Sequence, residues 1–134
     1  MNEMIENTGM DRQKLKTFIL ETYPASADRP WLQYPNYEVF RHSSNQKWFA
    51  VIMDLPKSKL GLQGEERIDA VNLKCGRIMA GSLLMENGFF PAYHLRKDSW
   101  ITVALDGSVA DDKIKMLLDV SYQATAPKVR KKKD

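Results

Sequence analysis

Apolar residues recur every three or four positions in three stretches of the chain, which is the spacing of helices that bury one face. In the first stretch, Leu15, Phe18 and Ile19 share such a face, and Pro24 ends it. The three predicted helices span Asp11–Tyr23, Gly76–Glu86 and Val109–Ala124.

Between these helices the apolar residues alternate with polar ones, and the period of two is that of β-strands. Turn-forming residues such as Ser43–Asn45 separate the alternating runs. The predicted strands are Tyr37–Arg41, Lys47–Leu55, Arg67–Lys74, Phe90–Leu95 and Ser99–Leu105. Two connections are long: Ala25–Pro35 is predicted to be an irregular loop, and Pro56–Glu66 a hairpin loop.

The run from Lys47 to Leu55 is the strongest strand signal, because both of its faces are apolar. Strict alternation puts Phe49, Val51 and Met53 on one face and Trp48, Ala50 and Ile52 on the other. A strand that is apolar on both faces is typical of the centre of a sheet.

The predicted order of elements is α-β-β-β-α-β-β-α. This order predicts an α+β protein built as a two-layer sandwich, with a mainly antiparallel sheet and the helices on one face. The chain has 134 residues, and residues 1–127 fit one domain.

The formal net charge is +3, but it is unevenly distributed. Residues 1–127 carry a net charge of −1, whereas the last seven residues carry +4. That basic tail contains Lys128, Arg130, Lys131, Lys132 and Lys133. We expect the tail, residues 128–134, to be disordered and to add salt-sensitive attraction to phosphate groups.

Several stretches resemble the MmcQ/YjbR family of small bacterial proteins. They are Val71-Asn72-Leu73-Lys74-Cys75, Pro91–Leu95 followed by Ser99–Val103, and Leu117–Tyr122. The resemblance covers about Asp11 to Ala124 and implies a CyaY-like fold, in agreement with the order of elements above.

The family is commonly described as DNA-binding through two β-hairpins that act as wings. The resemblance therefore implies weak, largely non-specific DNA binding, with Lys57 and Lys59 in one hairpin loop and Arg96 and Lys97 in the other. Contacts of this kind to phosphates position a protein without reading the base sequence. The basic tail would strengthen them.

An alternative uses the sheet face that the helices leave uncovered. Its candidate residues are aromatic, namely Tyr37, Trp48, Tyr93, His94 and Trp100. An exposed aromatic face is typical of a binding site for a protein or a small ligand, and self-association into a homodimer would cover the same surface.

The sequence nominates no reaction. His42 and His94 lie in separate predicted strands, and no phosphate-binding loop or nucleophile elbow accompanies them. Cys75, at a predicted helix start, is either a thiolate favoured by the helix dipole or a small buried residue. We therefore expect a non-enzymatic protein without cofactor or metal.

The cellular location is predicted from the membrane-spanning and signal segments for which the sequence can be searched. No run of about 18 apolar residues, the length of a membrane span, occurs, and Met1–Met10 has no apolar signal segment. With the lone Cys75, these features predict a cytoplasmic protein that makes no contact with a membrane.

Overall fold

The structure is a computed structural model and describes residues 9–127. One sheet contains six strands in the order β1-β2-β3-β4-β6-β5, and every neighbouring pair is antiparallel. The elements in chain order are α1 (Arg12–Thr22), β1 (Ala25–Asp28), β2 (Glu38–His42), β3 (Trp48–Pro56), the 3₁₀ helix η1 (Lys57–Leu60), β4 (Arg67–Lys74), α2 (Arg77–Leu83), β5 (Phe89–Pro91), β6 (Trp100–Ala104) and α3 (Asp111–Thr125).

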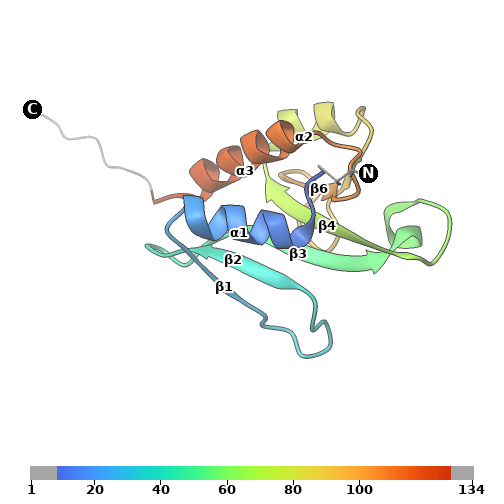
Figure 1. Ribbon diagram of the computed structural model, residues 1–134. Coiled ribbons are helices and arrows are strands. Elements are labelled where there is room, and N and C mark those ends of the chain that lie inside the picture. Colours follow the sequence, from blue (N-terminus) through green and yellow to red (C-terminus); the bar gives the residue numbers. More distant parts are fainter. Residues whose placement is uncertain (1–8, 128–134) are drawn as a thin grey trace, which may run out of the picture.

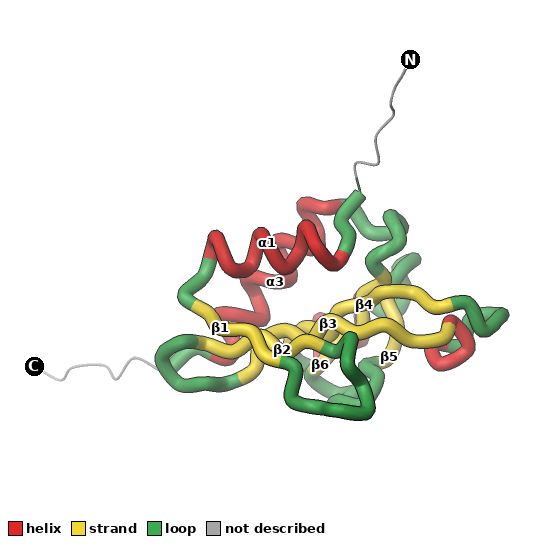
Figure 2. The backbone as a smooth tube through the Cα atoms, turned by 60° about the horizontal axis from the view of Figure 1, so that its bottom comes forward, coloured by secondary structure: helices red, strands yellow, loops and turns green. Residues whose placement is uncertain are grey.

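The α-helices form one layer and the sheet the other, so the predicted α+β two-layer sandwich is confirmed. Figure 2 shows α1 and α3 on the same side of the sheet, and in Figure 1 α2 lies beside α3. Within residues 9–127, the opposite face of the sheet is covered by loops and by η1, whose Leu60 packs with Val51 and Met53. One of these loops joins β1 to β2 and lies below both strands in Figure 1.

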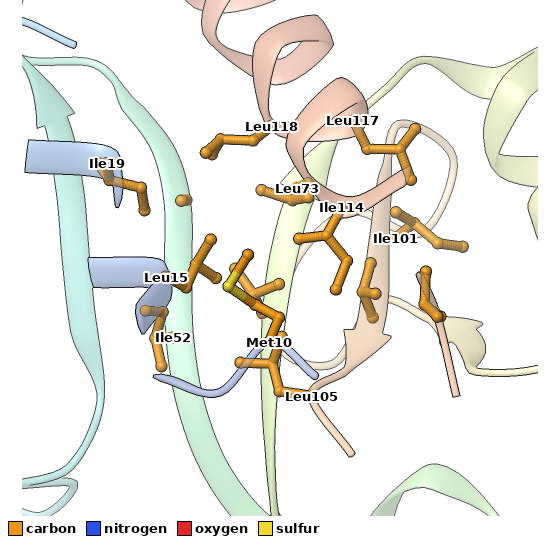
Figure 3. Close-up of a cluster of buried hydrophobic side chains, with 14 of the residues drawn as sticks. Met10, Leu15, Ile19, Ile52, Leu73, Ile101, Leu105, Ile114, Leu117 and Leu118 are labelled. Carbon is orange, nitrogen blue, oxygen red and sulfur yellow. The ribbon is translucent and has the colours of Figure 1, made fainter. Parts of the chain in front are cut away.

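The main core lies between the helices and the sheet (Figure 3). Leu15 and Ile19 of α1 and Leu117 and Leu118 of α3 are completely buried there. They pack over strand residues such as Leu73. The predicted helical spacing of these leucines and isoleucines is therefore what joins the two layers.

The ends of the sheet differ from the sequence prediction. Residues 25–28 form the edge strand β1 rather than an irregular loop, with Ala25 opposite His42 and Asp28 opposite Val39. Its four residues alternate between alanine and a polar residue, but a run this short with such small apolar side chains is not distinguishable from a loop in the sequence. β5 is also shorter than predicted, because the chain leaves the sheet after Pro91.

The predicted faces of β3 are corrected at its start. Arg41 pairs with Trp48 while the preceding Phe40 pairs with Ala50, so the register shifts by one residue. Because of this bulge, Phe49 and Ala50 both belong to the helix-side core. Trp48 instead lies with Val51 and Met53 on the other face.

Helix α3 is attached to the sheet by buried polar groups. The Ser121 hydroxyl donates to the carbonyl oxygen of Phe49 at 2.6 Å and accepts from the backbone N–H of Lys74 at 2.9 Å. Near the end of the helix, His42 Nε2 lies 2.9 Å from Thr125 Oγ1. These contacts fix the height and rotation of α3 over β3 and β4.

Candidate functional site

A cavity of about 470 Å³ lies on the sheet face that the helices leave uncovered. We call it the aromatic pocket. Its floor comes from β3 and β4, and its walls from the segments 29–37 and 92–99. The lining residues are Trp31, Gln33, Tyr34, Tyr37, Trp48, Val51, Met53, Asn72, Tyr93, His94 and Leu95. This volume is in the range of small-molecule sites in proteins.

The rings around the aromatic pocket support one another. Trp31 stands at 86° to both Trp48 and Tyr37, with ring centroids 5.5 and 6.2 Å away. Tyr34 stacks on Tyr37 at 4.8 Å, and Tyr93 lies 3.9 Å from His94. The edge-to-face pairs of Trp31 and the stacked pair of Tyr34 and Tyr37 have favourable geometries for aromatic rings, so these rings hold one another in place.

One wall is held from below by two buried polar side chains. Asn72 on β4 donates to the carbonyl oxygen of Tyr93 at 2.8 Å, and the backbone N–H of Tyr93 donates to the Thr102 hydroxyl at 3.0 Å. Thr102 in turn donates to the Asn72 side chain. Both side chains are buried and hydrogen-bonded, so the backbone of Tyr93 is clamped over the sheet.

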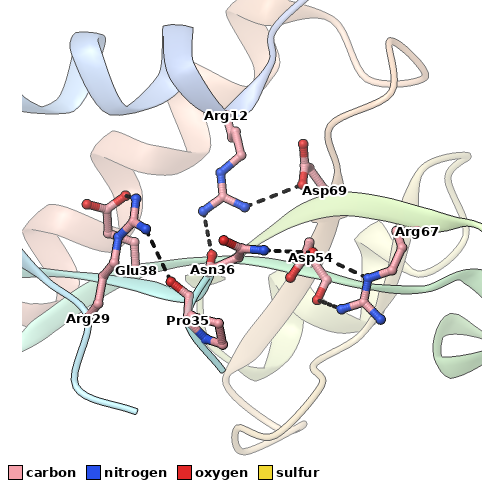
Figure 4. A network of polar contacts seen from close by, with 8 residues as sticks. All are labelled: Arg12, Arg29, Pro35, Asn36, Glu38, Asp54, Arg67 and Asp69. Carbon is pink, nitrogen blue, oxygen red and sulfur yellow. Dashed lines mark hydrogen bonds and ion pairs between the residues drawn. The ribbon is translucent and has the colours of Figure 1, made fainter. Parts of the chain in front are cut away.

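The other wall is held by the polar network of Figure 4. Arg12 of α1 donates to the carbonyl oxygen of Asn36, and its guanidinium also lies 3.4 Å from Asp69. The Asn36 amide donates to Asp54 at 3.3 Å. This network anchors the end of the loop that carries Trp31.

Asp54 is a fixed acceptor in this network. Partial burial by itself raises the pKa of Asp54, but hydrogen bonds from Arg67 and Asn36 outweigh that effect and lower the pKa below its usual value. The carboxylate therefore remains charged and keeps accepting from both donors at neutral pH.

Two residues that line the aromatic pocket are unusual, one in its buried hydroxyl and the other in its backbone conformation. Tyr37 is 6% exposed, and its hydroxyl makes no hydrogen bond with the described residues. Burial raises the pKa of Tyr37 to about 12, so the hydroxyl is a neutral donor. His94 has a φ of 68°, in the left-handed region that side-chain-bearing residues avoid, and strained backbones of this kind gather at functional sites.

The structure brings together four of the five aromatic-face candidates. Tyr37, Trp48, Tyr93 and His94 line the aromatic pocket, whereas Trp100 does not. Sequence reasoning missed Trp31 and Tyr34, which lie in the loop before β2. It also missed Asn72, although an amide in an otherwise apolar central strand needs a buried hydrogen-bond partner and is a usable signal.

The basic candidates lie apart from one another. The loop with Lys57 and Lys59 leaves the sheet where Pro56 pairs with Arg67, at the first residue of β4. The loop with Arg96 and Lys97 enters β6 opposite Lys74, at the last residue of β4. Eight strand residues separate the two ends, which corresponds to about 23 Å.

Two of these four cations already have a carboxylate partner. Lys57 pairs with Glu66 at 3.1 Å, and Arg96 pairs with Asp98 at 3.0 Å. The hydrogen bond from Arg96 lowers the pKa of Asp98, so this pair persists in mildly acidic solution. The tail candidates Lys128, Arg130, Lys131, Lys132 and Lys133 lie outside the described residues.

The remaining candidates offer little chemistry. Burial raises the pKa of the Cys75 thiol, which opposes the thiolate interpretation. Within residues 9–127, His, Cys, Asp and Glu form no group of three or more that could hold a metal ion. No helix of that part of the chain is both long and apolar enough to cross a membrane.

Fold and site together define a class: a small two-layer α+β protein with an uncharged aromatic pocket on the open face of its sheet. The YjbR family model matches residues 20–124, and the chain belongs to the YjbR family. The Bacillus subtilis protein YyaQ is 36% identical over 116 residues, which cover 87% of this chain and 98% of YyaQ. Escherichia coli YjbR is 42% identical over 59 residues, covering 43% of this chain and 50% of that protein.

Solved structures agree with this assignment. A crystal structure of a Pseudomonas syringae protein has a TM-score of 0.85 and 41% identity, and the match covers 87% of this chain and 100% of that one. A Deinococcus radiodurans protein has a TM-score of 0.67 at 21% identity, over 90% of this chain and 81% of the other, so it supports the fold alone.

Proposed function

We propose that this protein is a non-enzymatic binding protein and that its aromatic pocket receives a small ligand. The observation that carries the proposal is a cavity whose two walls are each held in place by hydrogen bonds to the rest of the protein. Asn72 and Thr102 clamp one wall, and the network around Asn36 holds the other. Such preorganisation lowers the entropy that a ligand loses with its partner on binding.

The alternative, DNA binding by paired wings, receives less support from the same geometry. The two hairpin loops start from opposite ends of β4, and two of their four cations are paired with Glu66 and Asp98. A clamp on neighbouring phosphates needs cations that converge and are free to replace counterions. Binding in the aromatic pocket needs neither condition.

The experiment is a fragment screen on the full-length protein, followed by amide chemical shifts in two-dimensional NMR. We expect a subset of fragments to shift the amides of Val51, Asn72 and Tyr93, which surround the aromatic pocket. In the variant Trp31→Leu the affinity for these fragments falls at least tenfold, because one wall loses its ring. The matched control is Leu32→Ala, since Leu32 is the next residue in the same loop but is 95% exposed.

The outcomes separate the two functions. Shifts at the pocket amides that Trp31→Leu abolishes and Leu32→Ala preserves support the proposal. It is contradicted if no fragment shifts these amides while duplex DNA at low salt shifts the amides of residues 57–60 and 96–97. The latter result favours the wing mechanism.

A further inference from the structure

The aromatic pocket has features that select among ligands. We infer that its ligand carries a flat, uncharged heteroaromatic ring with hydrogen-bonding atoms on its edge, the chemistry of a nucleobase. This inference rests on the proposed function, and three properties of the pocket lining carry it: its charge, its ring geometry and an unpaired buried hydroxyl.

The charge of the lining argues for an uncharged ligand. None of the residues that line the aromatic pocket is Asp, Glu, Lys or Arg, and the one imidazole in the lining, that of His94, belongs to a solvent-exposed residue. Two arginines close to the lining are already paired, Arg41 with Asp28 at 3.1 Å and Arg67 with Asp54 at 3.3 Å. A charged group that enters the cavity would lose its water without gaining an unpaired counter-ion, and that exchange is unfavourable.

Aromatic pockets often bind methylated ammonium ions, but here one of the rings already has a cation. The guanidinium carbon of Arg41 lies 5.6 Å from the centre of the Trp48 ring. A second cation at that ring would meet a like charge, and repulsion would oppose the cation–π attraction. The cavity of about 470 Å³ is also large for a single ammonium group.

The arrangement of the rings argues for a flat ligand. Trp31 is perpendicular to both Trp48 and Tyr37, so neighbouring walls meet at about a right angle. A planar ring can stack on one such wall while its edge faces the other, and both geometries are favourable. A round aliphatic group would gain contact area but neither of these ring interactions.

The unpaired hydroxyl argues for polar atoms on the ligand's edge. Tyr37 is more than nine-tenths buried, and its hydroxyl makes no hydrogen bond with the part of the chain that the structure describes. A pure hydrocarbon would cover this group and leave it unpaired, which opposes binding. A ring nitrogen or carbonyl oxygen would accept its proton. Asn72 is not available for this, because Tyr93 and Thr102 already occupy it.

The test compares probes on the full-length protein by the same amide shifts. The flat, uncharged probes are adenosine and uridine. The comparison probes are tetramethylammonium, benzoate and ribose, which are respectively cationic, anionic and without an aromatic ring. We expect at least one nucleoside to bind with a Kd at least tenfold lower than that of any comparison probe.

Two variants isolate the hydroxyl. Tyr37→Phe keeps the ring and removes only the hydroxyl, and we expect it to weaken nucleoside binding at least fivefold. Tyr122→Phe is the matched control, because it also loses a single tyrosine hydroxyl, but one that contacts Pro24 away from the pocket lining. An unchanged Kd in Tyr37→Phe overturns the assignment of the hydroxyl.

Further measurements distinguish a free nucleoside from a base in a nucleic acid strand, and they separate this inference from the proposed ligand-binding function. If a short oligothymidine binds more tightly than the nucleosides, and its affinity falls as the salt concentration rises, the natural ligand is an exposed base of a single strand. If the ligand is a free nucleoside, its affinity should depend little on salt. Tighter binding of tetramethylammonium, benzoate or ribose overturns this inference and leaves the ligand-binding function standing. If neither these probes nor any fragment shifts the pocket amides, both proposals are wrong.

Discussion

The two faces of the sheet are covered in different ways. The helix side is closed by helices such as α1 and α3, whose inward-facing Leu15, Ile19, Leu117 and Leu118 are completely buried. The loop side is closed by segments 29–37 and 92–99, and these leave the aromatic pocket between them. The helix side thus carries the main apolar core, while the loop side holds an accessible cavity in place with polar clamps. This division lets the loop side change its chemistry without loss of the fold.

The largest expected difference between the faces is in the cost of removing a leucine side chain. Leu118→Ala on the helix side should lower the free energy of unfolding by about 2–5 kcal/mol, because Leu118 is fully buried and a cavity remains. Leu95→Ala in the pocket wall should cost about 1 kcal/mol or less, because Leu95 is only half-buried. Urea unfolding of both variants measures the difference. Equal losses would show that the faces share the stability evenly.

A second comparison uses the buried polar group on each face. Asn72→Ala leaves the Tyr93 carbonyl without its donor and the Thr102 hydroxyl without an acceptor for its proton, and we expect a loss of about 2–3 kcal/mol. Ser121→Ala leaves the Phe49 carbonyl and the Lys74 N–H unpaired, and should cost a similar amount.

The variants Asn72→Ala and Ser121→Ala should differ in their effect on the aromatic pocket. Asn72→Ala releases the loop around Tyr93, so its amide should exchange hydrogen faster and fragment binding should weaken. Ser121→Ala acts from the helix side and should leave both unchanged. The comparison breaks down if Ser121→Ala disturbs the pocket as much as Asn72→Ala does.

The smallest expected effect is the pH dependence from His42. Burial lowers the pKa of His42 below its usual value, and its ring stacks on Tyr122 at 3.9 Å. Because the folded state prefers the neutral ring, this contribution to stability is complete above about pH 6.5 and is lost as the pH falls through the lower folded pKa.

Urea unfolding between pH 5.5 and 8 measures this contribution. In wild type the free energy of unfolding should fall toward the acidic end, and His42→Gln should flatten that slope. His94→Gln is the control, because His94 is exposed. A slope that persists in His42→Gln assigns the pH dependence to another group.

Much of the fold could be predicted from local pattern. Arg67–Lys74 alternates as expected, with Ile68 and Ala70 on the loop side and Val71 and Leu73 on the helix side. The edge strand Ala25–Asp28 could not be predicted this way. It is short and half polar, and its backbone pairing with β2 is a contact between distant parts of the chain.

The aromatic pocket was only partly predictable for the same reason. Tyr37 and Tyr93 are placed by alternation in or beside strands, so a shared face was inferable. Trp31 reaches the pocket because its loop turns back over the sheet and is anchored where Asn36 meets Arg12 and Asp54. Those partners are 18 or more positions away in the sequence, and no local pattern reports them.

The bulge near the start of β3 has a consequence for sequence change within the family. One additional residue there decides that Trp48 faces the cavity and Phe49 the helices. Deletion of Phe49 would restore strict alternation and leave Trp48 facing the cavity, whereas deletion of Trp48 would bring Phe49 to the cavity side. In both cases one ring stays at the cavity and the helix-side core loses one, so sequence alignments at this position should sort relatives by whether Trp or Phe forms this wall.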